Sequence, residues 1–148
     1  MLDLIIKNGS CYIDKDLKDQ DIAIKDGKII KIGKIDSEAK ETFDAEGLTV
    51  LPGCIDTQTH FREPGSTDTE DLHSGSRAAI VGGITSVFEM PNTNPPTSTK
   101  VEFQKKLDLA KNRMYCNYAF YFGATADNAN ELADLVNLEG CCGIKLFA

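Results

Sequence analysis

The order of apolar segments in the last hundred residues constrains the fold more than any other feature of the chain. From residue 48 onward, short apolar runs of strand length alternate with segments of helical periodicity, in the order βαβαβαβ. Strands joined through helices pair in parallel, because each helix returns the chain across the sheet in a right-handed crossover. The sequence therefore predicts an α/β fold, either an open doubly wound sheet or part of a (β/α)8 barrel.

Capping signals locate the helices of this region. Thr67 with Glu70, and Thr99 with Glu102, have the Ser/Thr-x-x-Glu spacing in which side chains bond the free backbone N–H groups of a helix start. Asn128 followed by Glu131 predicts a third start. The expected helices end at Gly82-Gly83, near residue 113 and at Gly140, and the expected strands between and after them cover 84–90, 115–122 and 143–147.

The first fifty residues have a different, β-rich pattern. Apolar runs at 22–24 and 29–32 flank Asp26-Gly27, a pair that supplies the positive φ angles of a two-residue hairpin turn. A polar stretch, 36–46, separates this hairpin from the alternating region. A complete (β/α)8 barrel takes roughly 250 residues, so the alternating region corresponds to about half of one.

Composition excludes several classes of partner. The net charge of -7 argues against nucleic acid, which requires a clustered basic face. No apolar run approaches the ~20 residues of a membrane helix, and the amino terminus lacks a signal-peptide layout, so we expect a cytoplasmic protein that acts on a small molecule. Five cysteines without a C-x-x-C pair are interpreted as reduced, buried side chains: Cys11, Cys54, Cys116, Cys141 and Cys142.

Polar side chains gather where one apolar strand is expected to end. Alternate residues of an extended chain point to the same side, so Asp56, Gln58 and His60 are predicted to face one site. Active sites of (β/α)8 barrels lie at this end of the strands. A lone histidine is more often structural than a ligand, but Arg62 adds a fourth polar group within seven residues, which favours a functional site.

Two motifs carry a resemblance to a known family. Pro-Gly-Cys-Ile-Asp at 52–56, followed by His-Phe-Arg-Glu-Pro-Gly at 60–65, resembles the dihydroorotase signature, and Met-Pro-Asn-Thr-Asn-Pro at 90–95 resembles that family's second signature. The resemblance extends through 82–85 and 143–145. It implies the first half of a TIM-type (β/α)8 barrel, about four strands and three helices over 51–148, preceded by part of a small β-sandwich over 1–50.

The resemblance also implies a metal site for hydrolysis of a cyclic amide. In relatives, two zinc ions share a lysine carbamate and activate a water for attack on the ring. Carried over by position, His60 is a metal ligand, Lys145 is the carbamate-forming lysine, and Arg62 and Asn92 bind the substrate carboxylate. The residue types are suited to this, because a guanidinium fork pairs with a carboxylate and a lysine in an apolar strand is held as a reactive neutral amine.

Two departures from the family pattern affect this expectation. Gln58 stands where most relatives have the first histidine of a His-x-His pair. An amide oxygen is a weak zinc ligand, so one of the family's two zinc positions should be weakened or lost, and we expect one or two zinc ions. The family's other histidine ligands and its proton-transferring aspartate come from later strands. No complete catalytic set is therefore expected within the chain. We expect the chain to be part of a longer enzyme and to be inactive by itself.

The sequence favours one function and leaves two alternatives open. The first is the interconversion of dihydroorotate and N-carbamoyl-L-aspartate in pyrimidine biosynthesis. The second is another cyclic amidase such as an allantoinase, although allantoinases tend to carry asparagine in place of Arg62. The third, favoured by Gln58, is an inactive dihydroorotase-like subunit that stabilises aspartate transcarbamoylase. The sequence also leaves open that the protein forms a homo-oligomer. His73, inside the first expected helix, is interpreted as structural, and Glu89 receives no role.

Overall fold

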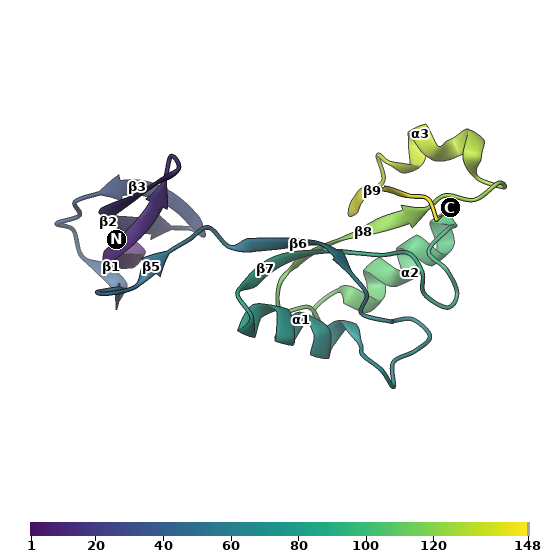
Figure 1. Ribbon diagram of the computed structural model, residues 1–148, viewed down its shortest axis with the longest axis horizontal. Coiled ribbons are helices and arrows are strands. Elements are labelled where there is room, and N and C mark those ends of the chain that lie inside the picture. Colours follow the sequence, from purple (N-terminus) through teal and green to yellow (C-terminus); the bar gives the residue numbers. More distant parts are fainter. Residues whose placement is uncertain (148) are drawn as a thin grey trace. The chain divides into compact units, whose positions relative to one another are not determined.

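The structure, a computed structural model, describes residues 1–147. It consists of two units, Met1–Pro52 and Gly53–Ala148, each built around its own sheet (Figure 1). Within the described residues, no helix has both the length and the apolar character needed to cross a membrane.

The first unit is a five-stranded sheet. Its order is β3-β2-β1-β4, and β5 pairs with β1 as well. Asp26 and Gly27 have φ angles of 51° and 70°, so the predicted hairpin turn is confirmed. The side chains of Ile5, Ala23 and Ile35 form a small buried cluster. The strands are β1 (Leu2–Ile13), β2 (Asp16–Lys25), β3 (Lys28–Gly33), β4 (Ala39–Asp44) and β5 (Thr49–Val50).

Two segments of this unit differ from the sequence prediction. The polar stretch 36–46 contains β4, which pairs in parallel with β1 although most of its side chains are exposed. Backbone hydrogen bonds hold β4 in place, and hydrophobic periodicity does not report them. The apolar run 48–51 was expected to open the alternating region, but its strand β5 belongs to the first sheet. The assignment of residues 1–50 to a β-sandwich stays a prediction, because the described strands form one sheet.

The second unit is a parallel four-stranded sheet with helices between its strands. The sheet order, β6-β7-β8-β9, follows the chain, and all three pairings are parallel (Figure 1). This confirms the predicted α/β alternation and the half-barrel sheet. The strands are β6 (Cys54–Thr59), β7 (Ile84–Glu89), β8 (Asn117–Gly123) and β9 (Cys141–Lys145), and the helices are α1 (Leu72–Val81), α2 (Lys100–Ala110), the 3₁₀ turn η1 (Ala129–Glu131) and α3 (Leu132–Leu135).

The helices cover one face of this sheet. Side chains of β7 and β8 meet side chains of all three α-helices in one buried cluster, which includes Val87, Phe120, Phe122, Leu72, Phe103 and Leu135. Since neighbouring strand residues point to opposite faces, Phe88 and Tyr121 lie on the other face, where their rings meet edge to face at 6.4 Å. The sheet therefore has one face covered by helices and a second face formed by the alternate strand residues, which point away from the helices.

Helix α1 begins later than its predicted capping box. The N-cap is Asp71, whose carboxylate accepts the Ser74 N–H at 2.7 Å, while Ser74 Oγ accepts the Asp71 N–H at 3.3 Å. Thr67 and Glu70 lie in the preceding turns, so the predicted start is wrong. A contact from outside the helix favours the later start, because the Glu63 carboxylate accepts the Leu72 N–H. The predicted end at Gly82 is confirmed.

Replacing Asp71 with alanine is expected to lower the free energy of unfolding by about 1 kcal/mol, because the Ser74 N–H at the start of α1 would lose its acceptor. Thr67→Ala is the matched control, and it should change stability by less than about 0.5 kcal/mol. Urea unfolding of both variants measures the difference. A larger loss for Thr67→Ala than for Asp71→Ala would mean that the helix starts at the earlier box.

Helix α2 starts as predicted and buries one residue that was not expected. Thr99 Oγ1 accepts the Glu102 N–H at 3.1 Å, and the helix ends at Ala110, earlier than the expected residue 113. Phe103 and Ala110 are buried. Lys106 is buried on the same face and is fully inaccessible.

The third helix is shorter than predicted. The Asn128 side chain does not cap it, since it accepts from the Thr125 N–H and donates to the carbonyl of Gly123. These bonds brace the loop after β8 and leave one 3₁₀ turn and the four-residue α3. Leu135 is buried and Val136 is exposed.

The cysteines are free thiols, as predicted, but not all are buried. Cys11 and Cys116 are buried, Cys141 and Cys142 are half-buried, and Cys54 is exposed at the start of the edge strand β6. Burial raises the pKa of the Cys142 thiol to about 12 and also raises the pKa of Cys116. These two thiols therefore stay neutral at physiological pH, which favours packing over reactivity.

Candidate functional site

The carboxyl ends of β6 and β7 bring two predicted site residues into contact. His60 follows β6, Asn92 follows β7, and His60 Nδ1 lies 2.9 Å from Asn92 Oδ1. The amide oxygen is satisfied when Nδ1 carries the proton and donates it. That tautomer leaves the lone pair of Nε2 free, which is the form of histidine that binds a metal.

Gln58 and His60 are two residues apart at the end of β6, but the predicted strict alternation does not extend to Asp56. The pairing of β6 with β7 shifts register between Asp56 and Thr59, and such a bulge changes the direction of the side chains around it. The Asp56 carboxylate accepts the Gln58 N–H at 2.9 Å, a local bond. Gln58 and His60 lie on either side of Thr59, which is buried, so both project to the other face.

Arg62 lies in an exposed turn after β6. Its φ angle is 61°, in the left-handed region that non-glycine residues seldom adopt, and its carbonyl accepts the Ser66 N–H at 2.9 Å. The side chain is exposed. Its positive charge favours the ionised form of Glu89, behind the strand end.

Lys145 lies at the same edge of the sheet as His60 and Asn92, because all four strands are parallel and it ends β9. Strands β7 and β8 lie between β6, which precedes His60, and β9, which ends at Lys145. Lys145 is half-buried, with Nζ 5.3 Å from the centre of the Phe147 ring, and Leu146 beyond it is exposed. The apolar neighbours therefore desolvate the amine only in part, and its role as a carbamate-forming lysine stays a prediction.

The described residues offer single candidate ligands for a metal and no grouped set of them. Residues 1–147 contain no group of three or more His, Cys, Asp or Glu side chains placed to hold a metal ion. Catalytic zinc takes three protein ligands and leaves one position open. His60 Nε2 fits the first of these, and the Gln58 amide oxygen is a weaker candidate for another.

Behind His60 lies a buried ion pair that the sequence did not reveal. Glu89 Oε1 accepts the Phe61 N–H at 3.2 Å, and Oε2 is paired with Lys106 Nζ of α2. Lys106 Nζ also donates to the Met90 carbonyl at 3.0 Å. Burial raises the pKa of Glu89 to about 7, against the opposing effect of Lys106, and burial lowers the pKa of Lys106. A lysine on the apolar stripe of α2 was the available sequence signal.

A second buried carboxylate holds the same loop. Glu63 accepts from Arg113 Nη1 at 2.8 Å and Nη2 at 3.1 Å, a two-to-two pairing, and from the Leu72 N–H at 2.9 Å. This pairing raises the pKa of Arg113. Glu63 and Arg113 are far apart in the sequence, and no local pattern connects them.

His73, interpreted as structural, lies in α1, and its Nε2 lies 3.2 Å from the Tyr115 hydroxyl oxygen.

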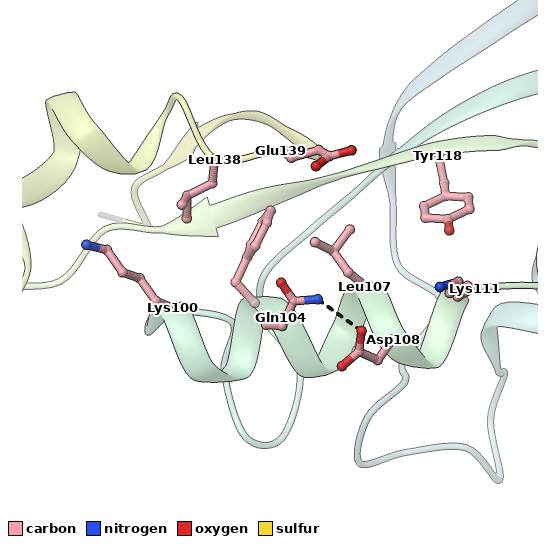
Figure 2. Close-up of a pocket in the computed structure, with 10 residues that line it drawn as sticks. Lys100, Gln104, Leu107, Asp108, Lys111, Tyr118, Leu138 and Glu139 are labelled. Atoms are coloured by element: carbon pink, nitrogen blue, oxygen red, sulfur yellow. Dashed lines mark hydrogen bonds between the residues drawn. The ribbon is translucent and has the colours of Figure 1, made fainter.

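A hollow of about 750 Å³ lies between α2 and the turn before β9, and Figure 2 shows Leu107, Tyr118 and Leu138 around it. Gln104 and Asp108 at its rim bond to each other at 2.9 Å. None of the predicted site residues lines this hollow, so it is separate from the candidate site.

The chain is similar to known proteins over almost its whole length. The chain is 41% identical over 146 residues to allantoinases of Escherichia coli, among them those of strains ED1a and HS, and this covers 98% of the chain and 32% of each relative. Among solved structures, L-hydantoinase (dihydropyrimidinase) from Arthrobacter aurescens matches 97% of the chain and 32% of its own length, with 34% identity and a TM-score of 0.88. D-Hydantoinase (dihydropyrimidinase) from Thermus sp. matches 90% and 31%, with 27% identity and a TM-score of 0.73.

These relatives are cyclic amidases by name, and the chain spans about a third of their length. The expected relationship to cyclic-amide hydrolases is thus confirmed, while the narrower dihydroorotase assignment is not shown by them. A family profile described as the amidohydrolase family matches residues 49–140. Since that match covers more than half of the sequence, the chain belongs to the amidohydrolase family.

Proposed function

We propose that this chain forms the amino-terminal part of a metal-dependent hydrolase that opens a cyclic amide or ureide ring. The observation that carries the proposal is the contact between His60 and Asn92 at the carboxyl ends of adjacent parallel strands. Zinc held by His60 Nε2 and by ligands beyond these residues would supply a water-derived nucleophile at neutral pH. Gln58 would be a weak second ligand, which favours one strong zinc position over two.

The other predicted residues have roles consistent with their places. With its oxygen bound to His60, the Asn92 amide can turn its NH₂ group toward a substrate carbonyl or carboxylate. The exposed Arg62 offers a planar fork to the same kind of group. Lys145, at the same edge, would hold metal as a carbamate.

Allantoin is the first candidate substrate, because the allantoinases are 41% identical over 98% of the chain. Dihydroorotate is the second, and the specific observation in its favour is Arg62 within the His-Phe-Arg-Glu-Pro-Gly motif, since dihydroorotate carries a carboxylate for a guanidinium to bind. An inactive subunit that assembles with aspartate transcarbamoylase is the third candidate, and Gln58 favours it.

Substrate assays of the protein at its native length test the proposal. We expect ring opening of allantoin, with at least one zinc per chain by elemental analysis, and loss of activity in His60→Ala. Arg62→Met should lower kcat/KM for dihydroorotate by roughly 10-fold or more, because a hydrogen bond to a charged group is lost, and should affect allantoin less. Absence of both zinc and turnover on either substrate would refute the enzyme proposal and favour the inactive subunit.

A further inference from the structure

Two cations of one helical segment reach behind the candidate site. Lys106 lies in α2, and Arg113 lies in the turn that follows it, where Arg113 Nη1 also donates to the carbonyl of Leu109. Each cation meets a buried carboxylate from elsewhere in the unit. Lys106 is paired with Glu89 at the end of β7, and Arg113 is paired with Glu63 in the loop after β6.

Both carboxylates act on the segment 60–65, which we call the His60 loop. Glu89 accepts the Phe61 N–H, and Glu63 is itself a residue of the loop. Phe61 and Glu63 are buried, at 6% and 7% exposure, whereas His60 is half-buried and Arg62 is exposed. The loop therefore alternates anchored residues with residues that are free to face a ligand.

The same cations also hold neighbouring parts of the site. Lys106 Nζ donates to the Met90 carbonyl, close in sequence to Asn92. Glu63 accepts the Leu72 N–H at the start of α1, so the pair formed with Arg113 joins the His60 loop to that helix. The segment that contains Lys106 and Arg113 is thus connected to both chain stretches that carry His60, Arg62 and Asn92.

Stability does not explain why Lys106 and the two carboxylates, Glu89 and Glu63, are buried. Replacing a buried ion pair with apolar side chains of similar volume is often neutral or stabilising, because removing charges from water is costly. Charged hydrogen bonds do provide direction, since a carboxylate that accepts from fixed donors holds the backbone around it in one arrangement.

We propose that Lys106 and Arg113 are positioning residues that, through Glu89 and Glu63, set the placement of His60, Arg62 and Asn92. This inference rests on the proposed function of that edge of the sheet. It goes beyond it by assigning the geometry of the site to cations that do not touch a ligand.

Nuclear magnetic resonance of the chain tests the placement without any assay of activity. The chain contains only two histidines, so the ring nitrogen signals of His60 can be assigned with His73→Asn. In the wild type, we expect the Nδ1-protonated tautomer and a hydrogen-bonded Nδ1–H. Arg113→Met should shift these signals toward those of a free imidazole, and unchanged signals would overturn the proposal.

The matched control is Lys105→Met, which removes an exposed cation from the same helix. Lys105 is exposed and pairs with Glu102 of the same helix at 2.8 Å, so its variant should leave the His60 signals unchanged. If both variants shift the signals equally, the effect is a general one of charge and the proposal fails. Should Arg113→Met not fold, Glu63→Gln carries the same test, because it keeps the shape of the side chain and an acceptor for Leu72.

Kinetics of the protein at its native length separate positioning from folding. With allantoin and dihydroorotate as probes, Arg113→Met should raise KM roughly 10-fold, as expected when a group that supports a ligand is removed, and Arg113→Lys should recover part of the loss. A merely structural role predicts fewer active molecules, and hence a lower apparent kcat with KM unchanged, which would contradict the proposal. Absence of turnover by the wild type would refute the proposed function, while the His60 signals would still decide the positioning role.

Discussion

Replacing Lys106 with methionine is expected to lower the free energy of unfolding by about 3–5 kcal/mol at pH 8, because Glu89 would remain as a buried carboxylate without its cation. Glu89 is 1% exposed and Lys106 is fully inaccessible, so water cannot replace the lost partner. Methionine fills most of the lysine volume, which limits any contribution from a cavity. Urea unfolding of the wild type and the variant measures the loss.

The double variant Glu89→Gln, Lys106→Met separates charge from packing. It removes both charges and keeps similar volumes, so it should recover most of the stability that the single variant loses. A double variant as unstable as Lys106→Met would assign the loss to packing. A loss below about 1 kcal/mol in the single variant would mean that Glu89 finds another partner.

The pH dependence of the same measurement has a definite sign. Burial raises the pKa of Glu89 from 4.5 to about 7 in the folded state. Between these values the folded chain binds a proton that the unfolded chain has released, so this group makes the free energy of unfolding fall as pH rises through the window. The deficit of Lys106→Met should accordingly be smaller at pH 5, where Glu89 is neutral, than at pH 8.

Local signals predicted the elements whose structure is set locally. The hairpin turn at Asp26-Gly27 and the cap at Thr99 depend on a few neighbouring residues, and both are as predicted. The start of α1 was wrong because the Glu63 side chain, from outside the helix, accepts the Leu72 N–H. Strand β4 was missed because backbone pairing with β1, and not an apolar pattern, forms it.

The candidate site divides in the same way. The position of His60 and Asn92 after consecutive parallel strands predicted that they share one edge, and their contact agrees with this. The pairing of Glu63 with Arg113 depends on the packing of the loop against α2, which no short motif encodes. The burial of Lys106 could have been predicted, because a charged residue on the apolar stripe of a helix requires a buried partner. The sequence does not identify Glu89 as that partner.

Replacing Gln58 with histidine is expected to strengthen zinc binding by roughly 10²-fold. Gln58 and His60 project to the same face on either side of the buried Thr59, so the new imidazole would stand beside the existing one. Structural zinc sites with four ligands bind with about 10–16 kcal/mol, which is roughly 3 kcal/mol for each ligand. An amide oxygen supplies little of this, because zinc prefers imidazole nitrogen and thiolate sulfur.

Zinc titration of the purified chain, followed by calorimetry, measures the gain, and the double variant Gln58→His, His60→Ala is its control. The double variant has the same number of histidines as the wild type but lacks the adjacent pair, so its affinity should return to about the wild-type level. An equal gain in both variants would mean that any histidine at position 58 binds zinc by itself. No gain in the single variant would mean that residue 58 lies away from the metal. The prediction that Gln58 weakens one zinc position would then be wrong, and His60 would bind the metal without help from residue 58.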